Sequence, residues 1–344
     1  MDKARTSPRR LSVPDTIGLA FVALLLVWLA INFVKGPQEF VNVALIGLTN
    51  GAIYGLVALG YTLVYGILQL INFAHGDVFA LAGLVASSVI VSVLGLDTGS
   101  SIVVIVGGLL VTLVLIMSGF ALFNASIERI AYRPLRNAPR LAPLITAIGM
   151  SFIVQNISLA FYGVDYQTVP NFISRSPVFE VGSVSYSWNK LTVLIIVVPL
   201  LVLLTWFVTS TRQGKAMRAV AQDTEASAMM GIDVNRTIGV TFMIAGALAG
   251  GAGIVYLLQF NMRYDTGFQL GLIAFTAAVL GGIGNLAGAV LGALTIGFIE
   301  AFNEGLTWNA PGSDWTRTIV FAILILILVF RPEGLLGERT PEGA

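Results

Sequence analysis

Long apolar segments recur along the whole chain, and they constrain its fold more than any other feature. An α-helix needs roughly 20 residues to cross the hydrocarbon core of a bilayer, and most of these segments have about that length. They predict an all-α polytopic membrane protein with about ten spans, or nine if the short segment 268–282 is re-entrant. The candidate spans are 17–34, 41–66, 78–96, 102–123, 141–163, 191–209, 238–260, 268–282, 286–302 and 316–330.

The composition excludes several classes of protein. Hydrophobic residues make up 56% of the chain and charged residues 11%, whereas a soluble domain carries about 25% charged residues. The net charge of +1 gives no basic field for nucleic acid. Cysteine is absent and His75 is the single histidine, so we expect no metal site and no catalytic residues in this chain.

The distribution of basic residues predicts the orientation. Ten spans place 14 of the 19 Lys and Arg residues on one side. Because positive charge stays cytoplasmic, both termini are expected in the cytoplasm. The inner residues are Lys3, Arg5, Arg9, Arg10, Arg129, Arg133, Arg136, Arg140, Arg212, Lys215, Arg218, Arg236, Arg331 and Arg339, and the outer ones are Lys35, Arg175, Lys190, Arg263 and Arg317.

The spans define one transmembrane domain, 16–331, between a basic cytoplasmic tail, 1–15, and a second cytoplasmic tail, 332–344. The first span resembles a signal peptide, but its length and the lack of a small-x-small cleavage site favour a retained span. A cytoplasmic loop covers 211–237. The extracytoplasmic loop 164–190 is either a small hairpin or lid that receives a binding protein, or a plain connection.

A weak repeat relates the second and seventh spans. Residues 64–69 resemble residues 255–259, and both follow a Gly-rich helix. The two spans run in opposite directions, which predicts an inverted repeat of the kind that supports alternating access. Glycines four residues apart place small residues on one helix face for close packing. The candidate packing glycines are Gly47, Gly51, Gly55, Gly284, Gly288 and Gly292, with Gly246 and Gly250 in the seventh span.

Polar residues at membrane depth are costly unless they line a cavity or find partners. Asn72, His75, Gly76 and Asp77 interrupt the apolar stretch between the second and third spans. Gly76 is expected to let the chain turn and Asp77 to cap the next helix. The segment either borders the transport pathway or gate, or is a capped turn at the cytoplasmic interface.

Gln155 and Asn156 lie in the middle of the fifth span. They are candidates for the translocation pathway, where their amides would bond to a substrate, but they could equally bond helix to helix.

The loop 211–237 is the most informative hydrophilic stretch. Residues 214–230 predict one amphipathic helix, with Gly231 as its left-handed terminator. Its mixed charge, from Arg218, Asp223 and Glu225, favours docking to a soluble partner over a lipid surface. No phosphate-binding P-loop occurs in the chain, so ATP, if used, is bound by another chain.

Three stretches carry a resemblance to a known family. Glu225-Ala226-Ser227-Ala228-Met229-Met230-Gly231 resembles the Glu-Ala-Ala-x-x-x-Gly coupling loop of ABC importer permeases, with Ser in place of the second alanine and without the downstream extension. The stretch 61–77 is far more specific, and the ending 331–337 adds to the resemblance. From about Phe40 onward the chain resembles the branched-chain amino acid permease family, and its LivH-like subunits in particular.

This resemblance implies a heteromeric importer in the bacterial inner membrane. Its partners would be a second permease subunit (a LivM-like paralogue or a second copy), two ABC ATPase subunits that bind ATP and Mg, and an extracytoplasmic substrate-binding protein. Glu225, Ala226 and Gly231 would belong to the helix that couples to an ATPase, with Arg218 and Asp223 beside them. This chain would hold no cofactor of its own.

The substrate and two other classes of function remain open. Relatives in the family carry urea, short amides or other amino acids, and the sequence does not choose between a homodimer and a heterodimer. An ion-coupled transporter needs carboxylates at depth, for which Asp77 and Glu300 are the candidates. A membrane-embedded enzyme has less support, because the chain offers one histidine and no clustered carboxylates.

Overall fold

The computed structural model describes residues 13–136, 138–139, 141–330 and 333–337, and the side chains of residues 13–22 are not described. Most of the predicted tails 1–15 and 332–344 therefore lies outside the described residues. The helices are α1 (Val13–Lys35), α2 (Pro37–Leu68), α3 (Ala74–Ser88), α4 (Ile102–Ile127), α5 (Leu141–Tyr162), α6 (Trp188–Ser210), α7 (Arg212–Gln222), α8 (Thr224–Met229), α9 (Val234–Leu257), α10 (Thr266–Gly281), α11 (Leu286–Gly305) and α12 (Ser313–Phe330).

The long helices coincide with the apolar segments of the sequence. Within the described residues, 8 helices are long and apolar enough to cross a membrane. Two shorter apolar helices, Ala23–Lys35 within α1 and α10, account for the remaining predicted spans. Short π-helical segments, Val89–Val93 and Glu128–Tyr132, continue α3 and α4, and the 3-10 turn Arg133–Leu135 follows. The structure is thus an all-α polytopic membrane protein.

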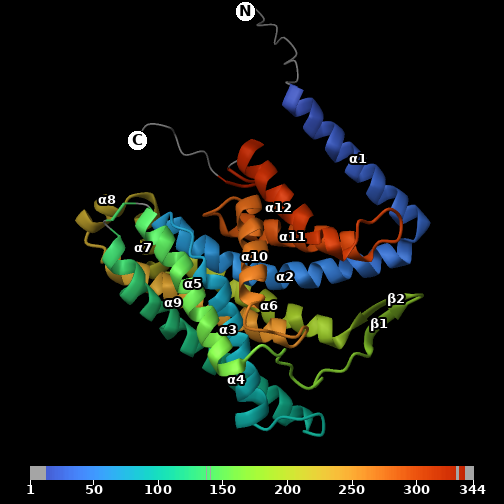
Figure 1. The fold of residues 1–344 in the computed structure, drawn as a ribbon, viewed down its shortest axis with the longest axis horizontal. Coiled ribbons are helices and arrows are strands. Elements are labelled where there is room, and N and C mark those ends of the chain that lie inside the picture. Colours follow the sequence, from blue (N-terminus) through green and yellow to red (C-terminus); the bar gives the residue numbers. More distant parts are fainter. Residues whose placement is uncertain (1–12, 137, 140, 331–332, 338–344) are drawn as a thin grey trace, which may run out of the picture.

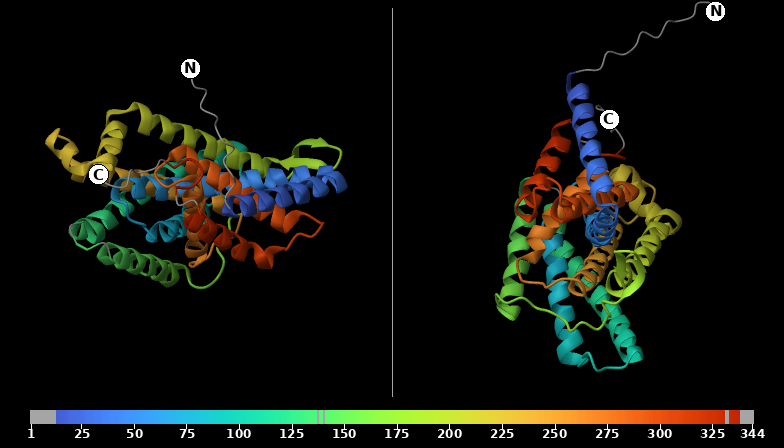
Figure 2. Two further views of the ribbon diagram at one scale, coloured as in Figure 1. Left: turned by 90° about the horizontal axis from the view of Figure 1, so that it is seen from above. Right: turned by 90° about the vertical axis from the view of Figure 1, so that its right-hand side faces the viewer.

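The loop after α5 contains a small β-hairpin. Strands β1 (Pro177–Val181) and β2 (Val184–Ser187) pair antiparallel, with Val181 opposite Val184 across a turn at Gly182, where φ is +65°. Asn42 of α2 bonds to the hairpin in both directions, since its Nδ2 donates to the carbonyl of Ser183 and its Oδ1 accepts from the amide of Ser185. This hairpin and the pair α7–α8 lie at opposite ends of the molecule (Figure 1, Figure 2).

The core is centred on α2. This helix packs against α11, α9, α10 and α6, and it crosses the molecule beside α10 and α11 (Figure 1). Its residues from Gly51 to Val64 are buried without interruption. In contrast, α4, α5, α6 and α12 expose many large aliphatic and aromatic side chains. An exposed apolar surface of this extent suits lipid or another membrane subunit.

Glycines allow α2 and α11 to approach closely. A Cβ placed on Gly51 would lie 2.8 Å from the Cα of Leu294, and one on Gly47 would lie 3.0 Å from the Cα of Phe298. Gly297 of α11 faces the backbone of both α2 glycines. Gly55 is less crowded, with the Cβ of Ala293 at 3.8 Å. Backbone contact without side chains is how membrane helices gain close van der Waals packing.

Of the candidate packing glycines Gly284, Gly288 and Gly292, only the last two pack between helices. Gly288 and Gly292 face α10, where their added Cβ atoms would meet the carbonyls of Gly281 and Ala277. Gly284 instead lies in the connection between α10 and α11 with φ of +95°, and nothing is within 4 Å of its added Cβ. It therefore serves the turn, which needs a left-handed residue, and not helix packing.

Connections that the sequence places on one side of the membrane contact each other. On the predicted outer side, the ammonium of Lys35 lies 4.6 Å from the centre of the Trp308 ring, and Gln167 forms a β-bridge with Met262. On the predicted inner side, the amide of Leu335 donates to the carbonyl of Leu280.

Candidate functional site

Asn72 is held between helices and not at a solvated turn. It lies in the short connection between α2 and α3 and is buried. The hydroxyl of Tyr132, in the π-helical segment that continues α4, donates to its Oδ1 at 2.7 Å. Among the described residues, Asn72 Nδ2 has no hydrogen-bond partner, so this amide keeps an unused donor inside the protein.

The His75 side chain packs into the space that Gly60 leaves on the surface of α2. Its ring lies against Gly60, where an added Cβ would overlap the ring, and it meets Tyr61 edge-on with centroids 4.9 Å apart. The ring is fully buried. Within the described part of the chain, neither ring nitrogen forms a well-aligned hydrogen bond, although the backbone of Val57 lies nearby. His75 is thus a packing residue in this conformation.

Asp77 is not the helix cap that the sequence suggested. Helix α3 begins at Ala74, so Asp77 lies within its first turn, and Phe73 at the cap position makes no side-chain cap bond. The carboxylate is fully buried and accepts a hydrogen bond of 2.5 Å from the hydroxyl of Ser151. Because Ser151 lies at the middle of α5, this carboxylate lies deep between the helices.

Gly76 does not turn the chain, because it lies within α3. A Cβ on Gly76 would clash with the carbonyl of Gly267 and would lie 2.8 Å from the Cα of Gly271. Both belong to α10. The residue is therefore glycine because the backbones of α3 and α10 touch there, next to the buried side chains of His75 and Asp77.

We expect the Ser151→Ala substitution to destabilise the protein by about 1–3 kcal/mol, because it leaves a buried carboxylate oxygen without a donor. The Ser158→Ala substitution on the same helix is the control, since the Ser158 hydroxyl bonds only to the backbone of α5. Thermal unfolding of the detergent-purified protein measures both. Equal melting temperatures for the two variants would show that the bond between Ser151 and Asp77 adds no stability.

Gln155 and Asn156 are not part of this buried cluster. Asn156 is exposed on α5, and its Nδ2 donates to the carbonyl of Phe152 in the same helix. Gln155 is half-buried. The sequence could not show this, because the face of α5 that packs on α3 is the one that carries Ser151.

The loop after α6 forms two helices and not the single helix that the pattern predicted. Helix α7 begins after Thr211, whose hydroxyl accepts from the amide of Gly214. The chain breaks at Asp223, which has extended backbone angles and caps α8 by accepting from the amide of Ala226 at 2.8 Å. Gly231 ends α8 with φ of +83°, in the left-handed conformation expected for a terminator.

The α8 tip presents apolar side chains to the outside. Met229 is 81% exposed and Met230 is 83% exposed. Glu225 on the same short helix is exposed, while Ser227 is buried against the protein. Arg218 of α7 donates to the carbonyl of Thr209 at 3.1 Å and so holds α7 against the end of α6. Adjacent exposed methionines on a rigidly capped turn are typical of a docking surface.

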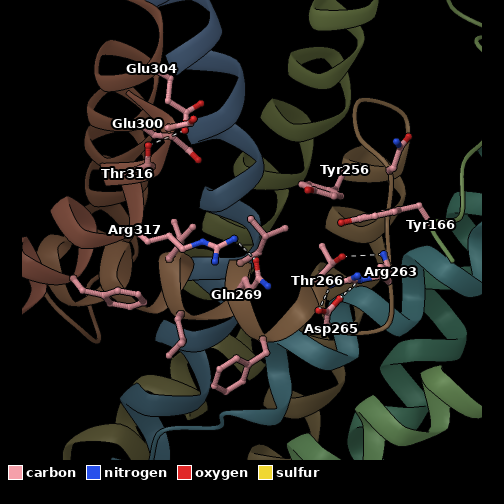
Figure 3. A pocket seen from close by; sticks show the side chains of 17 residues that line it. Tyr166, Tyr256, Arg263, Asp265, Thr266, Gln269, Glu300, Glu304, Thr316 and Arg317 are labelled. Carbon is pink, nitrogen blue, oxygen red and sulfur yellow. Dashed lines mark hydrogen bonds and ion pairs between the residues drawn. The ribbon is translucent and has the colours of Figure 1, made fainter. Parts of the chain in front are cut away.

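Sequence reasoning missed a large cavity among α10, α11 and α12. Its volume is about 530 Å³, and Tyr166 and Tyr256 close its other side (Figure 3). Glu300 accepts a 2.5 Å hydrogen bond from the hydroxyl of Tyr54 in α2. Glu300, Arg263 and Arg317 had separate signals in the sequence, but nothing there indicated that they line one cavity.

Ion pairs tie down two of the basic residues outside the spans. The Arg263 guanidinium bonds twice to Asp265, which raises the pKa of Arg263, and it lies 5.1 Å from the centre of the Tyr166 ring. On the predicted inner side, Arg136 pairs with Glu128 and donates to Asn235 at the start of α9. Burial lowers the pKa of Arg136, and Glu128 opposes that shift.

The fold and the buried polar groups define a multi-pass α-helical membrane protein. The family model of the permease component of branched-chain amino acid transport systems matches residues 43–328. That span covers most of the chain, so the protein belongs to this permease family.

In the described residues, no group of three or more His, Cys, Asp or Glu side chains is placed to hold a metal ion.

Curated relatives support the same assignment. The chain is 39% identical over 311 residues to the high-affinity branched-chain amino acid transport system permease protein BraD of Pseudomonas aeruginosa, covering 89% of this chain and 97% of the relative. It is 37% identical over 305 residues to LivH of Escherichia coli, covering 86% and 95%. A solved structure of PsaBC from Streptococcus pneumoniae in complex with Fab aligns at a TM-score of 0.42 and 14% identity over 88% of this chain and 96% of that chain, a likeness too low to support an argument.

Proposed function

We propose that this chain is the membrane-spanning permease subunit of an ATP-driven importer for branched-chain amino acids. The family match over residues 43–328 and the relatives' names support this substrate class. The exposed tip of α8 is the observation that best supports coupling to a separate motor. The proposal includes a second permease subunit, two ATPase subunits that bind ATP and Mg, and an extracytoplasmic binding protein.

We propose ten crossings in the inner membrane, with both termini in the cytoplasm. Two contacts that each join predicted outer connections support this, Lys35 with Trp308 and Gln167 with Met262, as does the bond of Leu335 to Leu280 on the predicted inner side. The proposal matters most for α1 and α10, because their described apolar stretches are short for a membrane crossing.

The packing of helices supports the proposed inverted repeat. If α2, α3, α4 and α5 correspond to α9, α10, α11 and α12, then the pairs α2·α11 and α9·α4 are equivalent, and both are extensive. The pairs α3·α9 and α10·α2 match in the same way, as do α3·α5 and α10·α12. Helices α3 and α10 then meet each other at Gly76 and Gly267, at the centre of the repeat. Such an arrangement suits alternating access around a central site.

The connectivity explains how a motor would move the pathway. An ATPase that binds α8 transmits its movement to α7 and α9, because short, capped connections at Asp223 and Gly231 join these helices to α8. Helix α9 packs against α2, α3 and α4. A displacement of α8 therefore reaches the contact of α3 with α10, where the buried polar residues lie.

The assembled importer in proteoliposomes tests this function. We expect leucine uptake to need ATP, the binding protein and the ATPase subunits together. The Glu225→Lys substitution should reduce uptake while the chain still inserts, because it reverses the charge beside the docking surface. Uptake by this chain alone, driven by an ion gradient without ATP, would contradict the proposal and indicate a secondary transporter.

A further inference from the structure

The cavity among α10, α11 and α12 contains charges of both signs that the protein does not neutralise. In the described part of the chain, the two ion pairs are Arg136 with Glu128 and Arg263 with Asp265. Neither involves Glu300, Glu304 or Arg317, although all three line the cavity. Glu304 and Arg317 are exposed and Glu300 is half-buried, so a small molecule that enters the cavity can reach all three charged groups.

The two carboxylates lie one helical turn apart on α11. Hydroxyl groups are their partners, since Glu300 accepts from Tyr54 and Glu304 accepts from Thr316 at 2.8 Å. Neighbouring carboxylates without a basic residue repel each other. A bound ammonium group would relieve that repulsion. It could also donate hydrogen bonds to both carboxylates, because it has three donors and no acceptor.

Arg317 supplies the opposite charge from α12. Its Nη2 donates to Gln269 Oε1 at 2.8 Å, and Figure 3 shows the two side chains pointing toward each other. A guanidinium carries five donors, so this bond leaves most of them for a carboxylate, which arginine binds strongly. The Arg263 guanidinium already forms an ion pair with Asp265, so it is not assigned to the ligand.

Part of the remaining wall is apolar. Phe268, Leu270 and Ile273 from α10 and Phe321 from α12 line the same cavity. Its volume of about 530 Å³ lies within the roughly 300–1,000 Å³ of small-molecule sites. An aliphatic side chain can lie against these walls while its charged groups reach the polar residues.

We propose that this cavity binds a zwitterionic aliphatic amino acid, with Arg317 holding the α-carboxylate and Glu300 and Glu304 holding the α-ammonium. The proposal rests on the function proposed above and narrows it. Urea and short amides carry no net charges for this pair of groups to recognise, so the cavity favours an amino acid over those substrates.

Photolabelling of the purified importer tests the site directly. The probe is a leucine that carries a photoreactive diazirine in its side chain, used without ATP and without the binding protein. We expect adducts on the peptides that contain Phe268 and Phe321, located by mass spectrometry. Leucine should compete for this labelling, whereas isovaleramide, isopentylamine and 4-methylpentanoate should not, because each lacks at least one of the two charges.

Variants separate the charges from the fold. Arg317→Gln and the double substitution Glu300→Gln with Glu304→Gln should each weaken labelling about tenfold to a hundredfold, as loss of a charge-assisted hydrogen bond does. Arg317→Lys should fall in between. Arg175→Gln and Glu180→Gln are the matched controls, because both side chains are exposed in the loop before α6, and they should label as the natural chain does.

Adducts away from the cavity, or equal competition by the neutral amide, would overturn the inference. Labelling by the glutamine variants at the natural level would overturn it as well. If one variant yields too little monodisperse complex, the adduct positions on the natural chain still decide. None of these results bears on whether uptake needs ATP, so a failure here is distinct from a failure of the proposed function.

Discussion

We expect replacement of both Met229 and Met230 by aspartate to abolish ATP-dependent uptake and to detach the ATPase subunits. Both side chains are more than four-fifths exposed in the isolated chain, and we infer that a partner covers them. An uncompensated buried charge costs about 3–5 kcal/mol, which corresponds to more than about a hundredfold loss of affinity. Co-purification of the ATPase subunits with the tagged permease measures the effect.

Leucine at both positions is the control, because it keeps the apolar volume and should preserve both co-purification and uptake. The folded state should be unaffected in either variant, since neither methionine packs in the core. If the aspartate variant still retains its ATPase subunits and transports normally, the α8 tip is not the docking surface.

The second large effect is expected at the contact between α2 and α11. The Gly297→Val substitution places its Cβ against the backbone of Gly51 and Gly47, which cannot move aside as a flexible side chain would. Overpacking costs about 1–3 kcal/mol, or more where the backbone must shift. We expect the variant to lose most of its monodisperse peak in size-exclusion chromatography and to melt at a lower temperature.

Gly119→Val is the control for this substitution. Gly119 is exposed on α4, and nothing lies within 4 Å of its added Cβ, so valine there should be tolerated. Equal stability of the two valine variants would mean that α2 and α11 do not pack through their glycines.

Much of the fold could be predicted because lipid imposes a simple rule on helices. A spanning segment must be apolar and about 20 residues long, and the residue types alone reveal that pattern. The location of Gly231 at a helix end could also be predicted, because few other residues adopt its left-handed conformation. The break at Asp223 was missed, although an aspartate followed by a short helix is a common cap signal.

The sites were harder to predict, because they depend on contacts between distant segments. Asp77 and Ser151 are 74 residues apart in the chain, and no local pattern pairs them. Gly76 looked like a turn residue, but its reason for being glycine is a backbone in α10. The cavity is built from residues 166–321, so its opposing charges meet only after α10, α11 and α12 have packed.

Cysteine labelling at position 230 tests the central claim most directly. That claim is that α8 is the site on the cytoplasmic side to which a separate ATPase binds. The chain has no cysteine, so Met230→Cys creates a single target for a membrane-impermeant maleimide. We predict no labelling from outside intact cells, labelling in inverted vesicles, and protection when the ATPase subunits are present. Labelling of intact cells from outside, or no protection by the ATPase subunits, would contradict the account.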